Sequence, residues 1–126
     1  MQITSVASFN PDIKCFGIDN FKVLDPDNKN SSIVEQRLDE FTSGNAEIIN
    51  MDFEEALLNL NKYINNKKVG VYFIDGPHDY RSQYLCLEFV KPYLSDNAII
   101  LVDDSNYSHV RRANYDWLRA NPEYTL

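Results

Sequence analysis

Four short apolar runs, separated by segments of helical periodicity, constrain the fold of this chain more than any other feature. The runs are KCFGID (14–19), AEIINM (46–51), VGVYFID (69–75) and AIILVD (98–103). They lack the strict alternation of apolar and polar residues that marks a strand with one water-facing side, which indicates strands covered on both faces. Strands that alternate with helices favour parallel pairing through right-handed crossovers. We therefore expect an open, mainly parallel α/β sheet with helices on both faces.

The segments between the runs carry helix start signals. Ser32 and Glu35 have the spacing of a capping box, and Asp52 with Glu55 repeats it. The pattern predicts four helices, which start near residues 32, 52, 80 and 108; the last two extend to about residues 94 and 120. Their expected inward-facing residues are Val34, Leu38, Phe41, Ala56, Leu57, Leu60, Ile64, Leu85, Phe89, Val110, Ala113 and Trp117.

Composition limits the classes of partner. A chain of 126 residues that is 44% hydrophobic can build one compact domain, which we expect to span residues 1–126. Its 12 Lys and Arg against 19 Asp and Glu give a net charge of -7, which disfavours nucleic acids and anionic membranes and favours small-molecule partners.

Met1 is not followed by a secretion signal, so a cytoplasmic protein is expected. Cys15 and Cys86 are expected to be buried, reduced thiols.

Acidic residues stand at the expected carboxyl ends of the strands, where ligands bind in open α/β sheets. Asp19 follows the first run, and an acid there can accept hydrogen bonds from the hydroxyls of a ribose, although a turn or capping role is the more common explanation for an isolated Asp. Asp52 has a structural explanation as a helix N-cap, which a ligand contact would share.

Asp75, Asp103 and Asp104 follow two strands that are expected to be neighbours, so three carboxylates would converge. Their mutual repulsion requires a bound cation, a retained proton or basic neighbours such as Arg81, Arg111 or Arg112. Oxygen ligands of this kind suit magnesium, manganese or calcium better than zinc. The alternative is three solvated carboxylates.

His78 lies three residues beyond Asp75, in the stretch Gly76-Pro77-His78. An imidazole at this place can take a proton from a substrate hydroxyl. A surface-loop histidine bonded to a backbone carbonyl is the competing explanation.

The stretch VYFIDGPHDYRSQYLCLEFVKPYLSDNAIILVDDSNY (71–107) resembles the class I S-adenosylmethionine-dependent methyltransferases, in the group with an Ile-Asp-Gly-x-His-x-Tyr segment and a later Asp-Asp. CFGID and IINMDFEEAL are similar to the family's second and third strands, so the resemblance covers about residues 10–118. It implies a Rossmann-like sheet and methyl transfer to a small-molecule hydroxyl. The residues that it implies are Asp19, Asp52, Asp75 and Gly76 for S-adenosylmethionine, Asp75, Asp103 and Asp104 for Mg²⁺, and His78 as the base.

Two segments of the family pattern have no counterpart in this sequence. The family begins with a strand and a glycine-rich loop, whereas MQITSVASFNPD is similar to the tail of the helix that follows that loop. ANPEYTL corresponds to the start of the family's closing strand pair. We therefore expect a fold fragment without the first strand, whose place would be between the runs 14–19 and 69–75, and without the C-terminal strand pair.

Three functions remain open at this point. The first is O-methyl transfer assisted by a divalent cation, with activity of this chain by itself left undecided because it has no glycine-rich loop. The second is a non-catalytic remnant of the fold that pairs its open strand edges in a homodimer. The third is a nicotinamide-dependent oxidoreductase that uses Asp19 for ribose.

Overall fold

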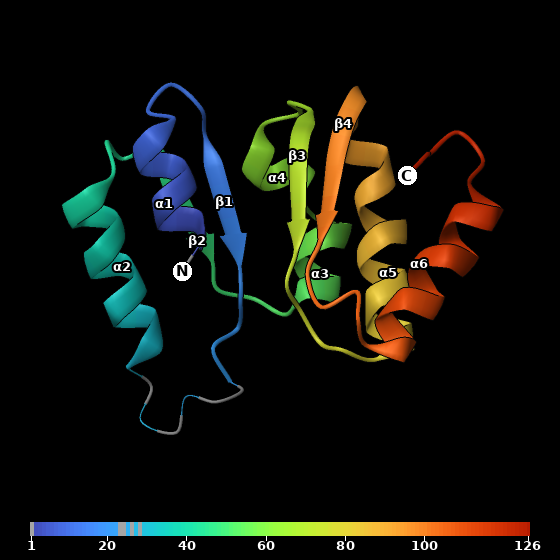
Figure 1. Cartoon of the computed structure of the whole chain (residues 1–126). Helices are drawn as coiled ribbons and strands as arrows, with labels where there is room; N and C mark the ends of the chain where they lie inside the picture. Colours follow the sequence, from blue (N-terminus) through green and yellow to red (C-terminus); the bar gives the residue numbers. More distant parts are fainter. Residues whose placement is uncertain (1, 23–24, 26, 28) are drawn as a thin grey trace. The chain divides into compact units, whose positions relative to one another are not determined.

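The computed structural model describes residues 2–22, 25, 27 and 29–126, in which helices alternate with strands (Figure 1). The elements are α1 (Gln2–Phe9), β1 (Cys15–Ile18), α2 (Asn30–Phe41), β2 (Ala46–Ile49), α3 (Phe53–Leu58), α4 (Asn61–Ile64), β3 (Val69–Ile74), α5 (Tyr80–Val90), the 3-10 helix η1 (Lys91–Tyr93), β4 (Leu94–Val102) and α6 (Ser108–Ala120). The chain divides into two compact units, Met1–Ala56 and Leu57–Leu126. Among the described helices, none is long and apolar enough to span a membrane.

The first unit is built on a parallel pair of strands. β1 runs beside β2 in a register from Cys15 opposite Ala46 to Ile18 opposite Ile49. Helix α1 packs against this pair at Gly17, where an added Cβ would lie 2.8 Å from Cδ1 of Ile48. The absence of a side chain at Gly17 therefore lets β1 sit close to its neighbours.

Helix α2 begins two residues before the predicted capping box, and its first N–H groups are capped by Asp25, which lies outside that box. The buried carboxylate of Asp25 accepts hydrogen bonds from the N–H groups of Lys29 (2.9 Å) and Asn30 (3.0 Å). Ser32 lies inside the helix, and its hydroxyl donates to the carbonyl of Lys29. The predicted capping box is therefore wrong, because a residue from the preceding loop already satisfies the first N–H groups.

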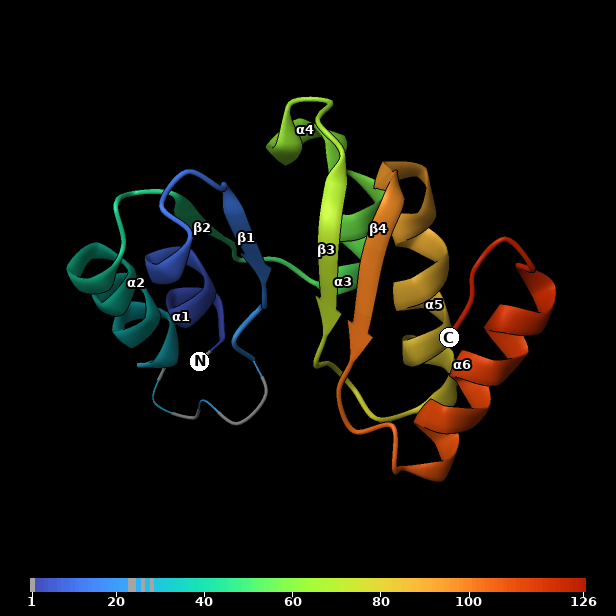
Figure 2. The ribbon, with the colours of Figure 1, turned by 45° about the horizontal axis from the view of Figure 1, so that its top comes forward.

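The second unit contains the other parallel pair, β3 and β4, with α5 and α6 packed together beside it (Figure 2). Trp117 of α6 is 2% exposed, and Val90 of α5 is fully buried. Burial raises the pKa of Tyr72 well above its ordinary value, and the neighbouring Cys86 thiol of α5 adds to that shift. Helix α5 thus covers the face of β3 that carries Tyr72.

The opposite face of this strand pair is apolar and open. Val71 lies opposite Ile99, and Phe73 lies opposite Leu101. All four side chains are at least 40% exposed, whereas Ile74 is buried. Within the described residues, these four side chains are more exposed than the sequence pattern predicts.

The α/β class and the parallel pairing are confirmed, and the strands pair as two separate two-stranded sheets in the described part of the chain. Helix α6 has the predicted length and buried residues. The helix predicted over 80–94 instead ends at Val90, and β4 begins at Leu94 rather than at residue 98. Phe41, predicted to face the core, is 54% exposed. Neither cysteine is in a disulfide within the described residues; Cys86 is buried, as predicted, whereas Cys15 is only partly buried.

Candidate functional site

The candidate site lies where β3 and β4 end. The N–H of Asp103 donates to the carbonyl of Ile74 at 2.9 Å, which extends the contact between the two strands by one residue. Asp75 directly follows β3, and Asp103 with Asp104 directly follows β4. The parallel register therefore places these acidic residues at one edge of the sheet, as the sequence predicts.

The loop after β3 is anchored at its far end by Asp79, the N-cap of α5. Its carboxylate accepts a hydrogen bond from the N–H of Ser82 at 2.9 Å. Hydrogen bonds from Ser82 lower the pKa of the Asp79 carboxyl below its ordinary value. Asp79 thus has a structural role, and it fixes the backbone next to His78.

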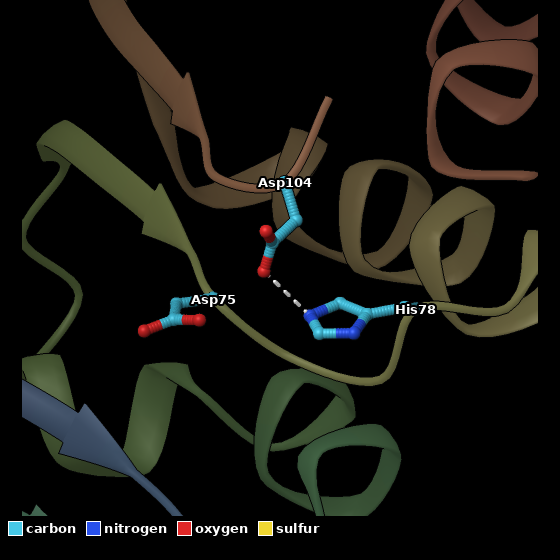
Figure 3. Close-up of side chains that lie close together, drawn as sticks. All are labelled: Asp75, His78 and Asp104. Carbon is cyan, nitrogen blue, oxygen red and sulfur yellow. Dashed lines mark ion pairs between the residues drawn. The ribbon is translucent and has the colours of Figure 1, made fainter. Parts of the chain in front are cut away.

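The imidazole of His78 contacts two residues of the loop after β4. Nε2 of His78 lies 2.7 Å from Oδ2 of Asp104, and the ring stacks on Tyr107 with centroids 4.9 Å apart and planes inclined by 9°. Figure 3 shows the carboxylates of Asp75 and Asp104 beside the imidazole. One ligand atom from each of Asp75, His78 and Asp104 lies within 4.8 Å of the others, which is compatible with a shared metal ion.

Asp103 is adjacent to this cluster but faces its own backbone. Its Oδ1 accepts the N–H of Asp104 at 2.8 Å, and Asp104 has a φ of 51°, in the left-handed region. A non-glycine residue in this conformation carries a local backbone cost, which aspartate tolerates better than most residues. The turn therefore directs the carboxylate of Asp104 toward His78.

Arg112, one of the basic residues considered as a neutralising neighbour, is occupied elsewhere. Its Nε lies 3.6 Å from Oδ2 of Asp116, and its guanidinium lies over the ring of Tyr80. The hydroxyl of Tyr80 donates to the same carboxylate at 3.1 Å. This group of residues stabilises the packing of α5 against α6 instead of neutralising the acidic cluster.

The first unit holds the two remaining predicted residues. Asp19 follows β1, and its Oδ1 accepts the N–H of Phe21 at 2.8 Å. Asp52 precedes α3, and its Oδ1 accepts the N–H of Glu54 at 3.0 Å. Both are exposed, and each has a second carboxylate oxygen outside these bonds. The capping role predicted for Asp52 is confirmed.

Tyr107 was not among the residues predicted for the site. The signal that could have identified it is its place in DDSNY, where an aromatic residue ends the loop after the Asp-Asp pair and immediately precedes α6.

Two surface cavities lie outside the His78 cluster. One, of about 170 Å³, lies beside α4 and η1, and the other, of about 210 Å³, lies on α5.

Comparison with known proteins identifies the family. A family model described as a methyltransferase domain matches residues 3–105. None of the curated proteins searched matches significantly. The fold is similar to the apo structure of CalS11, a TDP-rhamnose 3'-O-methyltransferase in calicheamicin biosynthesis, with a TM-score of 0.70 and 16% sequence identity.

That alignment covers 93% of this chain and 54% of the other, so the chain spans about half the length of the solved structure that it matches. At this identity the similarity establishes the fold. The family match extends over most of the sequence and includes Asp19, Asp52, Asp75, His78, Asp103 and Asp104. The chain therefore belongs to the methyltransferase-domain family, and its fold is that of the class I S-adenosylmethionine-dependent methyltransferases.

Proposed function

We propose that this chain forms part of an enzyme that transfers a methyl group from S-adenosylmethionine to a hydroxyl oxygen of a small molecule. The observation that carries this proposal is the 2.7 Å contact between Nε2 of His78 and Oδ2 of Asp104. An imidazole that is oriented by a carboxylate can accept a proton at its other nitrogen. Its location at the carboxyl ends of two parallel strands is the usual place for ligands in this class of fold.

S-adenosylmethionine, the donor that the family implies, supplies a methyl group bound to a positively charged sulfur. Asp19 and Asp52 fit its hydroxyl and amino groups, because each keeps an exposed oxygen that its local hydrogen bond does not use. Asp75 and Gly76 are proposed for the methionine end. An added Cβ at Gly76 would meet no atom within 4 Å, so the backbone there is open to a ligand.

The proton of the acceptor hydroxyl is proposed to move to Nδ1 of His78. Asp104 favours the tautomer with the proton on Nε2, which leaves a lone pair on Nδ1. In the described residues, no hydrogen bond involves Nδ1. As the oxygen–carbon bond forms and the sulfur–carbon bond breaks, the hydroxyl proton passes to Nδ1. The resulting imidazolium is then stabilised by the Asp104 carboxylate.

A divalent cation such as Mg²⁺ is proposed to bind through Asp75, Asp103 and Asp104. When bound, such an ion orients the acceptor oxygen and lowers its pKa. The carboxylates of this set, exposed in Asp75 and Asp103 and partly exposed in Asp104, suit a hard cation. The group that the structure brings together, Asp75, His78 and Asp104, offers an alternative in which the imidazole is a ligand and is not free to act as a base.

The acceptor class is proposed by analogy with the solved structure. That protein is described as acting on TDP-rhamnose, a deoxysugar joined to a nucleotide. A sugar hydroxyl has a high pKa and therefore benefits from a base placed as His78 is. Nucleotide-linked deoxysugars are accordingly the first acceptors to test.

The first experiment is calorimetric titration of the purified chain with S-adenosylmethionine, with and without Mg²⁺. We expect saturable binding, followed by formation of S-adenosylhomocysteine with TDP-rhamnose as the trial acceptor. The His78→Ala variant should lower the transfer rate by about 10²- to 10⁴-fold. The matched control is His109→Ala, which removes the chain's other histidine from an exposed position on α6. Absence of cofactor binding would contradict the proposal.

The cation is tested separately with the Asp103→Ala, Asp104→Ala double variant. We expect it to lose the Mg²⁺-dependent heat seen with the unmodified chain. Methyl transfer that persists at an unchanged rate in this variant excludes the metal role. Tighter binding of Zn²⁺ than of Mg²⁺, abolished by His78→Ala, would favour the alternative set that includes the imidazole.

A second candidate, a non-catalytic homodimer, is favoured by the open apolar face of β3 and β4. Val71, Phe73, Ile99 and Leu101 form two cross-strand pairs on that face, each residue at least 40% exposed. Apolar residues gathered in this way favour association with another surface. Sedimentation that shows a dimer, and a monomer for the Val71→Lys, Ile99→Glu variant, would support it. A monomeric unmodified chain would exclude it.

A further inference from the structure

We propose that Tyr107 is a positioning residue for His78, an inference that rests on the proposed role of His78 as a proton acceptor. The two rings stack nearly parallel, with centroids 4.9 Å apart and an angle of 9° between their planes. Tyr107 precedes α6 at its N-cap position and is 49% exposed, so burial in the core does not explain its place. The contact with His78 does explain it.

The contact with Asp104 and the stacking contact with Tyr107 restrict different motions of the imidazole. The contact between Nε2 of His78 and Asp104 fixes one edge of the ring, but the ring can still turn about the line that joins the two atoms. The stacking contact with Tyr107 fixes the plane of the ring. Together they determine the direction of Nδ1, the nitrogen proposed to accept the proton.

Both contacts come from one short turn. The N–H of Tyr107 donates to the carbonyl of Asp104 at 2.9 Å, which holds the two residues in a fixed relation. The hydroxyl of Ser105 also donates to the carbonyl of Val102, at 3.2 Å, and ties the turn to the end of β4. The loop after β4 therefore presents a carboxylate to the edge of the imidazole and an aromatic ring to its face.

The imidazole needs such support because its own loop leaves it exposed. The side chain of His78 is 45% exposed, and that of Asp104 is 34% exposed, so water competes for the contact between them. Aromatic contacts of this kind shift a conformational equilibrium by about 2- to 12-fold. We expect loss of the Tyr107 ring to reduce kcat within that range and to change KM little, as a role limited to orienting the base predicts.

The test uses NMR spectra of the imidazole carbon-bound protons, with no cofactor present. The chain has two histidines, His78 and His109, and the His109→Gln variant assigns their signals. Stacking on Tyr107 predicts upfield signals for His78. They should stay upfield in Tyr107→Phe and move downfield in Tyr107→Leu, while the His109 signals stay constant.

The matched control is Tyr115→Leu, since Tyr115 is a tyrosine on α6 with a similar exposure of 50%. It should leave the His78 signals and kcat unchanged, and Tyr107→Phe should restore the kcat that Tyr107→Leu loses. His78 signals that are the same in the unmodified chain and Tyr107→Leu would overturn the inference. If the unmodified chain transfers no methyl group, the proposed function fails, and the NMR comparison alone decides whether Tyr107 positions the ring.

Discussion

Oδ2 of Asp104 lies 2.7 Å from Nε2 of His78, and the two residues belong to loops that follow different strands. The contact therefore depends on the pairing of β3 with β4, which sets the two loops beside one another. It also depends on the left-handed conformation of Asp104. The register of β3 and β4 and the left-handed conformation of Asp104 together orient His78, the proposed base.

The Asp104→Asn variant should lower the rate of methyl transfer by about 10²-fold or more, because an amide does not stabilise an imidazolium as a carboxylate does. Initial rates of S-adenosylhomocysteine formation measure this effect. Asp96→Asn is the matched control, since Asp96 is exposed on β4 and is not part of the cluster. Equal rates for Asp104→Asn and the unmodified chain would remove Asp104 from the mechanism.

The sequence predicted which strand ends carry the candidate residues, because the position of a loop follows from strand order. It did not predict which side chains meet. Asp103 and Asp104 are adjacent and chemically identical, yet one binds its own backbone and the other contacts His78. That difference comes from the dihedral angles of a single turn, and so does the stacking of Tyr107 on His78.

The same distinction holds for the helices. Helix α6 was predicted correctly because its buried residues Val110, Ala113 and Trp117 recur at a regular spacing. The start of α2 was predicted wrongly because its cap, Asp25, lies several residues upstream in a loop. Periodicity is a property of the helix sequence itself, whereas a distant cap depends on how the preceding loop folds.

Asp25 provides a direct comparison of the predicted and observed caps of α2. Asp25→Ala should reduce the free energy of unfolding by about 1–2 kcal/mol, because two N–H groups lose their acceptors. Ser32→Ala, which removes only an exposed bond to the carbonyl of Lys29, should change it by less than about 0.5 kcal/mol. Urea unfolding followed by circular dichroism measures both. If Ser32→Ala reduced the free energy of unfolding more than Asp25→Ala, the predicted capping box of Ser32 and Glu35 would be supported instead.

Trp117 should be the most sensitive position in the packing of α5 against α6. Its side chain is 2% exposed, packs against Tyr124 with centroids 4.6 Å apart and donates from Nε1 to Glu88 at 3.0 Å. Trp117→Ala should cost about 3–5 kcal/mol through the cavity that it leaves. Trp117→Phe should cost less, because it keeps most of the buried volume and loses the hydrogen bond. Unfolding midpoints in urea rank the variants, with Tyr115→Ala as an exposed control on the same helix.

Glu88 should make the stability of this packing depend on pH. The hydrogen bond from Lys91, and then that from Trp117, lower the pKa of the Glu88 carboxyl below its ordinary value of 4.5. A group whose pKa is lowered by folding stabilises the folded state above its unfolded pKa and loses that contribution as the pH falls through its folded pKa.

The Glu88→Gln variant should therefore be less stable than the unmodified chain at pH 7, and the difference should shrink as the pH falls below about 4.5. We expect a difference of no more than about 1 kcal/mol at pH 7, because the Glu88 side chain is 38% exposed and water screens its pairing with Lys91. Thermal unfolding between pH 7 and pH 3 measures it, with Glu35→Gln as the control on an exposed position of α2. If the stability difference between the two chains grew on acidification, folding would raise the pKa of Glu88. That result would contradict the effect expected from the hydrogen bonds that Lys91 and Trp117 donate to it.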